Sequence, residues 1–284
     1  MTSKELPAKT LYLVGTPIGN LEDMTFRAVR ILQSVDLIAA EDTRHTAKLL
    51  QYFNIKTPQI SYHQHNRITR LPELLERLKQ GGAIALVTDA GMPGISDPGW
   101  EFVTACISNH ISVIPIPGVT AVITALTASG LATDRFIFEG FLPTKAKIRR
   151  DRLELLKQES ATIILYEAPH RLLQTLRDLG ATLGGDRAIV LARELTKIYE
   201  EFWRGTLAEA IELYQKNQPK GEFTLVVAGV EKTENCSLSE AQLKAELQAL
   251  IAQGMTPSQA SRQLAELTSL PRRQIYQLAI NYEL

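Results

Sequence analysis

A loop rich in glycine and proline follows one of the apolar runs of this chain and carries acidic side chains. The run 83–86 is typical of a buried strand, and residues 87–99 after it include three glycines and two prolines, with Asp89 near their start. Glycine lets main-chain groups come close to a ligand, and open α/β sheets bind ligands at the carboxyl ends of their strands. The pattern indicates a binding loop, with an ordinary strand-to-helix turn as the alternative. Ser96 and Asp97 are expected to cap the helix that follows.

Several basic segments have the composition of contacts to nucleic-acid phosphate. One is a donor-rich loop after residue 62, another carries five cations within residues 145–152, and a third opens the last helical pattern. A solvated loop or helix face explains such residues about as well, and Arg171 could instead pair with Glu167. The candidates for nucleic-acid contact are His63, His65, Arg67, Lys145, Lys147, Arg149, Arg150, His170, Arg171, Arg272 and Arg273.

Apolar runs alternate with helical patterns through the first half of the chain. Strands are expected at 10–14, 35–39, 83–87 and 111–114, and helices near 25–33, 44–52, 68–80 and 98–108. This alternation predicts βαβ units and a mostly parallel sheet. Because the carboxyl ends of parallel strands share one edge, the glycine- and proline-rich turns at 15–20, 87–99 and 116–121 should line one cleft.

The second half predicts a more mixed sheet. Strands are expected at 135–139, 161–166, 187–192, 199–204 and 222–228, with helices near 120–129, 145–158, 170–179 and 207–215. The short spacing between the strands at 187–192 and 199–204 favours an antiparallel pair. The expected organisation is an α/β domain at 1–119, a mixed α/β domain at 120–232 and a helical module at 233–284.

The helical module has the pattern of a helix-turn-helix. After a polar linker at 231–239, helices are expected near 240–253, 257–267 and 271–281. The last of them opens with Arg272 and Arg273 and could meet nucleic acid with its first residues. The alternative is a structural cap with an apolar core formed by Leu264, Leu267, Ile275 and Leu278.

Composition narrows the class of protein. The 284 residues carry 31 basic and 31 acidic side chains and are 45% hydrophobic, so an anionic partner must be met by a local patch. Cys106 and Cys236 lie far apart, which argues against a zinc site or a disulfide scaffold. The chain shows neither an apolar stretch of membrane-spanning length nor a signal-peptide core. We therefore expect a cytoplasmic protein that holds no metal and does not enter a membrane.

The glycine-rich turns differ from phosphate-binding motifs. The turn at 15–19 lacks the three-glycine dinucleotide fingerprint, and the chain has no glycine-rich run followed by Lys-Ser or Lys-Thr. A cofactor with few or no phosphates is therefore favoured.

Seven motifs, taken in order, resemble one known family. They occupy residues 16–23, 41–44, 89–99, 140–143, 166–171, 192–197 and 221–223. Together they are similar to the tetrapyrrole methylases, in the branch that acts on small-subunit ribosomal RNA, from about Leu11 to Val230 and on into the helical tail. The resemblance implies a homodimer of two-domain α/β subunits with S-adenosylmethionine in the cleft between domains. It also implies methylation of a cytidine ribose 2′-hydroxyl in the decoding region of 16S rRNA.

The same resemblance implies the cofactor contacts. They fall on Gly15, Pro17, Asp89, Ala90, Gly91, Met92, Ile95, Thr120, Ala121, Tyr166, Glu167, Glu194 and Leu195. Main-chain groups around Gly91 would do most of the binding, and Asp89 would position the loop. The chain departs from the family at 117–121, where Pro-Gly-Val-Thr-Ala replaces Pro-Gly-Pro-Ser-Ala, although Thr120 keeps a hydroxyl.

Methyl transfer from a sulfonium requires an aligned oxygen nucleophile and a group that removes its proton. It needs no metal, and the base would be a carboxylate, a histidine or a neutral lysine. The catalytic candidates are Glu41, Asp42, Arg44, Glu167 and Lys197. No spacing singles out one of them, and a capped, ion-paired helix start explains residues 41–44 equally well.

Two other functions stay open. A methylase of a small tetrapyrrole would share the fold, but the helical tail and the motifs at 16–23 and 166–171 resemble the ribosomal branch. A non-enzymatic nucleic-acid-binding regulator would use the tail and leave the loops of the two α/β halves unexplained.

Overall fold

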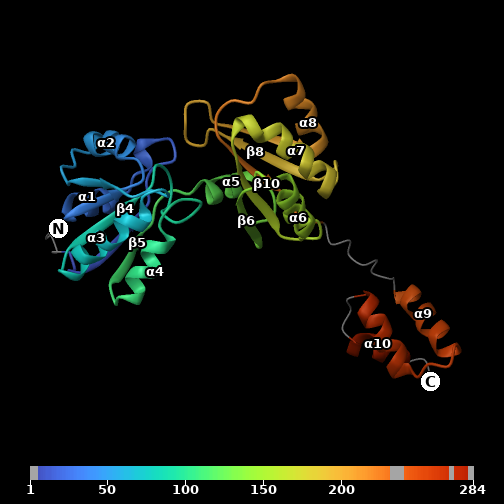
Figure 1. The fold of residues 1–284 in the computed structure, drawn as a ribbon. Coiled ribbons are helices and arrows are strands. Elements are labelled where there is room, and N and C mark those ends of the chain that lie inside the picture. The colour runs from blue at the N-terminus through green and yellow to red at the C-terminus, as the bar shows by residue number, and fades with distance from the viewer. Residues whose placement is uncertain (1–5, 231–239, 269–271, 281–284) are drawn as a thin grey trace. The chain divides into compact units, whose positions relative to one another are not determined.

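The structure is a computed structural model that describes residues 6–230, 240–268 and 272–280, and it builds the first half of the chain around a parallel sheet. The strands are β1 (Thr10–Val14), β2 (Leu37–Ala40), β3 (Gln59–Ser61), β4 (Ala83–Val87) and β5 (Ser112–Ile116). They pair in the order β3-β2-β4-β1-β5, and every pairing is parallel. The loops that follow β1, β2, β4 and β5 therefore leave from the same edge (Figure 1).

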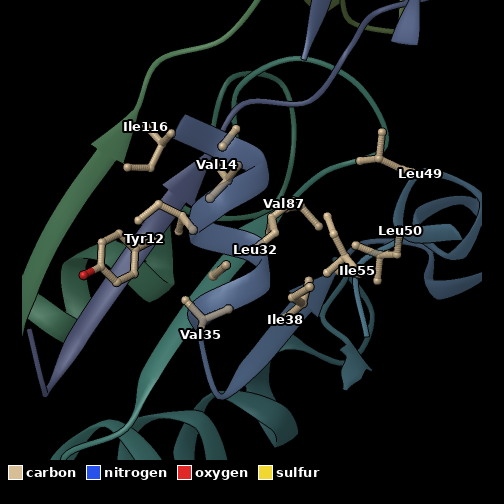
Figure 2. Packing of buried hydrophobic residues seen from close by; sticks show 14 of the residues in the cluster. Tyr12, Val14, Leu32, Val35, Ile38, Leu49, Leu50, Ile55, Val87 and Ile116 are labelled. Carbon is tan, nitrogen blue, oxygen red and sulfur yellow. The ribbon is translucent and has the colours of Figure 1, made fainter. Parts of the chain in front are cut away.

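Both faces of this sheet are covered by helices because its strands are apolar on both sides. On β1, Tyr12 and Val14 face the helices α1 (Phe26–Ser34) and α2 (Thr43–Tyr52), as Figure 2 shows for the packing around Leu32 and Leu50. Leu11 belongs to the cluster on the opposite face, with α3 (Arg67–Lys79) and α4 (Trp100–Ser108). Because successive side chains of a strand point to opposite faces, β1 contributes to a separate apolar core on each side of the sheet.

The second sheet is mixed, with order β6-β7-β10-β8-β9. Its strands are β6 (Phe136–Phe141), β7 (Thr162–Glu167), β8 (Ala188–Arg193), β9 (Glu201–Thr206) and β10 (Phe223–Val227). Only β6 and β7 are parallel among its pairings. Helix α5 (Ala121–Ser129) packs on one face, and α6 (Ala146–Leu156), α7 (Pro169–Leu183) and α8 (Leu207–Lys216) pack on the other.

The chain divides into two compact units, Met1–Gly229 and Val230–Leu284, so both sheets belong to the first. In the second unit, α9 (Glu240–Ala252), α10 (Pro257–Thr268) and α11 (Arg272–Ile280) enclose a small apolar core. Leu264 and Ile275 are buried in this core and Leu278 is partly buried, as expected for a structural cap. The expected linker at 231–239, Pro271, the side chain of Leu267 and Cys236 lie outside the described residues.

The fold class agrees with the sequence, including the parallel first sheet and the antiparallel pair β8–β9. Strand β3 was not predicted, because it is only three residues long and half-buried throughout. The expected cap at Ser96 and Asp97 is wrong. Helix α4 begins at Trp100 after Gly99, without a side-chain cap, so both side chains are free for another role.

Candidate functional site

The edge of the first sheet and the end of the second sheet line one cavity of about 490 Å³. This volume lies within the range of small-molecule sites, about 300–1,000 Å³. Its walls are Ile18, Glu41, Asp89, Ala90, Gly91, Met92, Ile95, Ser96, Asp97, Thr120, Ala121, Phe141, Tyr166, Glu167, Ala168, Pro169, Ala192, Leu195, Glu222, Phe223 and Thr224. The cavity thus gathers side chains that lie far apart in sequence.

The loops after β1 and β4 are tied together by main-chain bonds. The amide of Thr16 donates to Gly91 O at 2.9 Å, the amide of Gly91 donates back to Thr16 O at 3.0 Å, and the Thr16 hydroxyl donates to Thr88 O at 3.0 Å. Gly91 has φ +78°, a conformation that side chains with a Cβ rarely adopt. These contacts fix the main chain around Gly91 against one wall of the cavity.

Gly15 has a structural task in this arrangement. A Cβ added there would lie 2.7 Å from Met92 Sδ and 2.8 Å from Gly118 Cα. The loops after β1 and β5 can approach this closely only because both Gly15 and Gly118 lack side chains. Gly15 and Pro17 do not themselves line the cavity, whereas Ile18 of the same turn does.

Three carboxylates meet where β2 and β4 end. The Asp89 amide donates to Glu41 Oε2 at 3.3 Å, and the Asp42 amide donates to Asp89 Oδ1 at 3.3 Å, so each loop holds a carboxylate of the other. Burial raises the pKa of Glu41, with the charges of Asp89 and Asp42 acting in the same direction. The hydrogen bond from Asp89 and the charge of His63 oppose that rise.

Asp97 is the third carboxylate, and the sequence did not identify it as a site residue. Burial, followed by the charges of Glu41 and Asp89, raises the pKa of Asp97 to about 7, while a hydrogen bond with Thr88 acts in the opposite direction. The available signal was an acidic residue in the same loop as Asp89, which the sequence pattern assigned to a helix cap instead. Nothing local to residues 87–99 indicates that Glu41 lies beside it.

Tyr166 forms part of the opposite wall at the end of β7. Its ring packs edge-on against Phe138 and Phe141, with ring centroids 4.9 and 5.6 Å away. Burial raises the pKa of Tyr166, and the charge of Asp97 acts in the same direction, so the two side chains lie within electrostatic reach across the cavity.

The neighbouring Glu167 is occupied by contacts that hold the start of α7. Its Oε2 accepts from the Thr175 hydroxyl at 2.5 Å, and its Oε1 accepts from the Ala168 amide at 2.9 Å and lies 3.5 Å from Arg171 Nε. The side chain of Glu167 is 0% exposed. The pairing of Arg171 with Glu167, left open by the sequence, is therefore present.

The loop after β8 contributes Leu195 to the cavity wall, and its Lys197 pairs with two carboxylates. Lys197 Nζ lies 2.9 Å from both Glu194 Oε1 and Glu222 Oε2. Burial acts to lower the pKa of Lys197, but hydrogen bonds to the two carboxylates outweigh it and raise that pKa. Lys197 is thus held as a cation, and neither it nor Glu194 is among the residues that line the cavity.

Asp42 and Arg44 pair with each other at the start of α2. Arg44 Nη2 lies 2.7 Å from Asp42 Oδ2, and Asp42 also caps the helix by accepting from the Arg44 amide. Hydrogen bonds from Arg44 hold the pKa of Asp42 far below its usual range. The capped, ion-paired helix start that the sequence left as an alternative is thus present, and neither residue is among those that line the cavity.

The basic candidates differ in their exposure to solvent and in whether they form ion pairs. Lys145, Lys147 and Arg150 are exposed on and before α6, whereas Arg149 is paired with Asp178 at 2.6 Å. Arg171 donates to Leu142 O at 2.6 Å in addition to its Glu167 contact, and His170 is exposed beside it.

In the loop after β3, His65 is exposed and Arg67 pairs with Glu101 at 2.8 Å. The charge of His63 acts to lower the pKa of Glu41. In the second unit Arg272 and Arg273 are exposed, and Arg272 bonds to Ser258 Oγ at 2.9 Å.

Among the described residues there is no cluster of three or more metal-ligating side chains. Within that same part of the chain, no helix is both long and apolar enough to span a bilayer.

Two α/β sheets that line one cavity, with glycine-rich loops at the strand ends, are typical of a class of methylases. A model of the tetrapyrrole (corrin/porphyrin) methylases matches residues 10–211, and the chain belongs to this family. The resemblance drawn from the seven motifs is thereby confirmed.

Within the family, the chain is similar to proteins named ribosomal RNA small subunit methyltransferase I. It is 64% identical to the one from Synechocystis sp. over 96% of this chain and 98% of the relative. It is 47% identical to the one from Bacillus subtilis over 94% of this chain and 92% of the relative.

Solved structures share the fold. Uroporphyrin-III C-methyltransferase from Thermus thermophilus, complexed with S-adenyl homocysteine, is similar with a TM-score of 0.56 and 19% identity, over 77% of this chain and 97% of the other. Diphthine synthase gives a TM-score of 0.58 and 15% identity, over 77% and 90% of the two chains. At these identities the likeness concerns the fold alone.

Proposed function

We propose that this protein transfers a methyl group from S-adenosylmethionine to the 2′-hydroxyl of a cytidine ribose in the decoding region of 16S rRNA. The observation that carries the proposal is the near full-length similarity to the Synechocystis protein, 64% identical and named a ribosomal RNA small subunit methyltransferase. The enzyme would work in the cytoplasm as a homodimer, with rRNA or the small ribosomal subunit as its substrate.

The cavity fits the proposed cofactor in size and in chemistry. Its apolar side chains suit an adenine ring, and the hydroxyls of Thr120 and Thr224 with the main chain of residues 90–92 supply polar contacts. The residues proposed to hold the cofactor are Asp89, Ala90, Gly91, Met92, Ile95, Thr120, Ala121, Tyr166, Leu195 and Thr224. When bound there, S-adenosylmethionine supplies a methyl group that its sulfonium has already activated.

The protein's part in the reaction is to bind, align and accept a proton. Backbone groups around Gly91 are held by Thr16, so the cofactor wall is preformed. Of the five catalytic candidates, Glu41 alone combines a place in the cavity wall with a raised pKa. Glu167 lines the cavity too, but three hydrogen-bond and ion-pair partners occupy its oxygens.

RNA contact is proposed for the exposed cations around the first unit and at the start of α11. Lys145, Lys147 and Arg150 present positive charge without being paired to a carboxylate in any contact of the described residues, and His63 lies beside the acidic edge of the cavity. Phosphate contacts of this kind would make affinity for the substrate fall steeply with salt.

We also propose that residues 1–119 and 120–232 act as two α/β domains that share the cofactor site, and that 233–284 is a separate helical module. Support comes from the two sheets of the first unit and from the separation of the second unit at Val230.

The test is mass spectrometry of rRNA nucleosides from a strain lacking the gene. We expect loss of one 2′-O-methylcytidine, restored by the wild-type gene but not by a Gly91→Val variant. The valine side chain would be strained at φ +78° and would block close approach to the main chain. Asp89→Asn should only weaken cofactor binding, measured by calorimetry. Retention of the methyl mark in the deletion strain would refute the proposed function.

A further inference from the structure

Resting on this proposed function, we infer that Asp97 is the catalytic base that takes the proton from the attacking hydroxyl, and that Glu41 and Asp89 act on it as positioning residues. The established similarities do not single out this residue. Three features of the described structure point to it: its place in the cavity, the occupation of the other candidate bases, and the charges around it.

Asp97 lies on the wall that also holds the proposed cofactor contacts. It shares the loop between β4 and α4 with Ala90, Met92 and Ile95, all of which line the same cavity. Four residues of this loop have positive φ: Gly91, Gly94, Ser96 and Gly99, at +78°, +83°, +62° and +151°. The loop therefore presents Asp97 to the cavity instead of to the start of α4.

A bulge in the second sheet makes room for this loop. The pairing of β6 with β7 shifts register between Phe138 and Gly140, and Gly140 has φ +64°. A Cβ added at Gly140 would lie 3.2 Å from Ser96 Oγ. Because Gly140 has no side chain, the segment that carries Asp97 can lie against the second sheet, within electrostatic reach of Tyr166.

The other candidate bases are already engaged. Asp42 is paired with Arg44, Glu167 is bonded on both oxygens, and Lys197 is held as a cation between two carboxylates. Glu41 and Asp89 each accept a main-chain amide of the facing loop at 3.3 Å, and these bonds tie the loop after β2 to the loop after β4. Asp97 has the Thr88 hydroxyl as a partner and borders the cavity.

The charged and titratable groups that face Asp97 come from three elements. Glu41 follows β2, Asp89 follows β4, and Tyr166 ends β7. His63 acts in turn on Glu41, and Arg44 acts on Asp89. Burial and, after it, the two neighbouring carboxylates favour the protonated form of Asp97 and bring its pKa to about 7. A general base works best when its pKa lies near the pH at which the enzyme operates.

The proposed step couples transfer of a proton to Asp97 with transfer of the methyl group to the ribose oxygen. The O–H bond of the ribose 2′-hydroxyl breaks and its proton passes to the Asp97 carboxylate, which becomes the neutral acid. The oxygen uses its electron pair to bond to the methyl carbon, while the carbon–sulfur bond breaks and leaves its pair on sulfur, giving a neutral thioether. The proton then leaves Asp97 for solvent, since the side chain is partly exposed.

The experiment compares methyl transfer by the full-length wild type, Asp97→Asn and Asp186→Asn, with small ribosomal subunits from the deletion strain and methyl-labelled S-adenosylmethionine. Asp186 is an exposed residue between α7 and β8 and receives the same chemical change as a control. We expect Asp97→Asn to lower kcat at least about 100-fold, with the Kd for S-adenosylmethionine changed less than about threefold by calorimetry. Asp186→Asn should match the wild type.

A pH profile tests the role of the neighbours. For the wild type, kcat/KM should rise with pH through about 7 as Asp97 loses its proton. In Glu41→Gln one repelling charge is removed, so the acidic limb should move to lower pH even if the maximal rate falls. A purely structural role for Glu41 would leave the limb where it is, which would overturn this part of the inference.

The outcomes separate the inference from the proposed function. If the wild type transfers no methyl to the 2′-oxygen, the proposed function fails. If the wild type is active and Asp97→Asn retains more than about a tenth of its kcat, Asp97 is not the base. Loss of cofactor binding in Asp97→Asn, with an unchanged circular dichroism spectrum, would make it a binding residue and also overturn the inference.

Discussion

Replacing Asp97 by Asn should make the protein more stable while it removes activity. The pKa of Asp97 in the folded protein is about 7, against an ordinary value of 3.8. A tenfold change in an acid dissociation constant corresponds to about 1.4 kcal/mol, so the folded state bears a cost of about 4 kcal/mol as an upper limit when the group is charged. The side chain is partly exposed and solvent screens the charge, so we expect about 2 kcal/mol.

The sign of the pH dependence follows from the raised pKa. Above pH 7 Asp97 is ionised in both the folded and unfolded states, and the full cost falls on the folded state. As pH falls from 7 toward 4, the folded state takes up a proton that the unfolded state does not, and the cost disappears. The stability advantage of Asp97→Asn should therefore be largest near pH 8.5 and shrink steadily toward pH 4.

Urea unfolding followed by circular dichroism at pH 8.5 and pH 5 measures this difference, with Asp186→Asn as the matched control at an exposed position. The reasoning is refuted if Asp97→Asn is less stable than the wild type at pH 8.5, or if its stability difference is the same at both pH values. Either result would mean that the Asp97 charge is better solvated or better paired than its place beside Glu41 and Asp89 implies.

Three further changes test the packing that supports the site. Gly15→Ala would place a methyl group 2.8 Å from Gly118 Cα. We therefore expect the free energy of unfolding measured in urea to fall by about 2 kcal/mol and calorimetry to show weaker S-adenosylmethionine binding. An unchanged affinity would contradict the close approach. Thr206→Ala removes the capping box with Glu209 at the start of α8 and should lower the free energy of unfolding by about 1 kcal/mol, measured by thermal unfolding. An unchanged stability would show that the cap is dispensable. Phe102→Ala empties a fully buried site and should cost about 3–5 kcal/mol in urea; a cost below about 1 kcal/mol would mean that the core there is not closely packed.

The elements of the fold could be predicted because their signals are local. The apolar runs at β1 and β4 were identified to the residue, since consecutive apolar positions in a strand covered on both faces leave a continuous hydrophobic pattern. Strand β3 escaped because its three residues are half-buried and carry no such pattern. The binding loop after β4 was recognisable from its glycines and prolines, which are needed wherever a chain turns with positive φ.

The lining of the cavity was predictable in part. The family resemblance implies cofactor contacts at Ala90, Gly91, Met92 and Ile95, and all four border the cavity. Lys197 was a reasonable candidate by residue type, but its ammonium group forms an ion pair with Glu222, 25 positions away. No spacing along the chain indicates such a partner, because the antiparallel pairing of β8 with β10 brings the two together.

Residue types and local periodicity were therefore sufficient for the fold class and for the loop that lines the cavity, and the resemblance of the seven motifs indicated the family. The chemistry of individual carboxylates depended on long-range contacts. Asp97 looked like a helix cap until the structure placed it near Glu41, which lies far earlier in the chain, and within electrostatic reach of Tyr166. Burial and neighbouring charge set a pKa, and both come from segments that meet only when the sheets have formed.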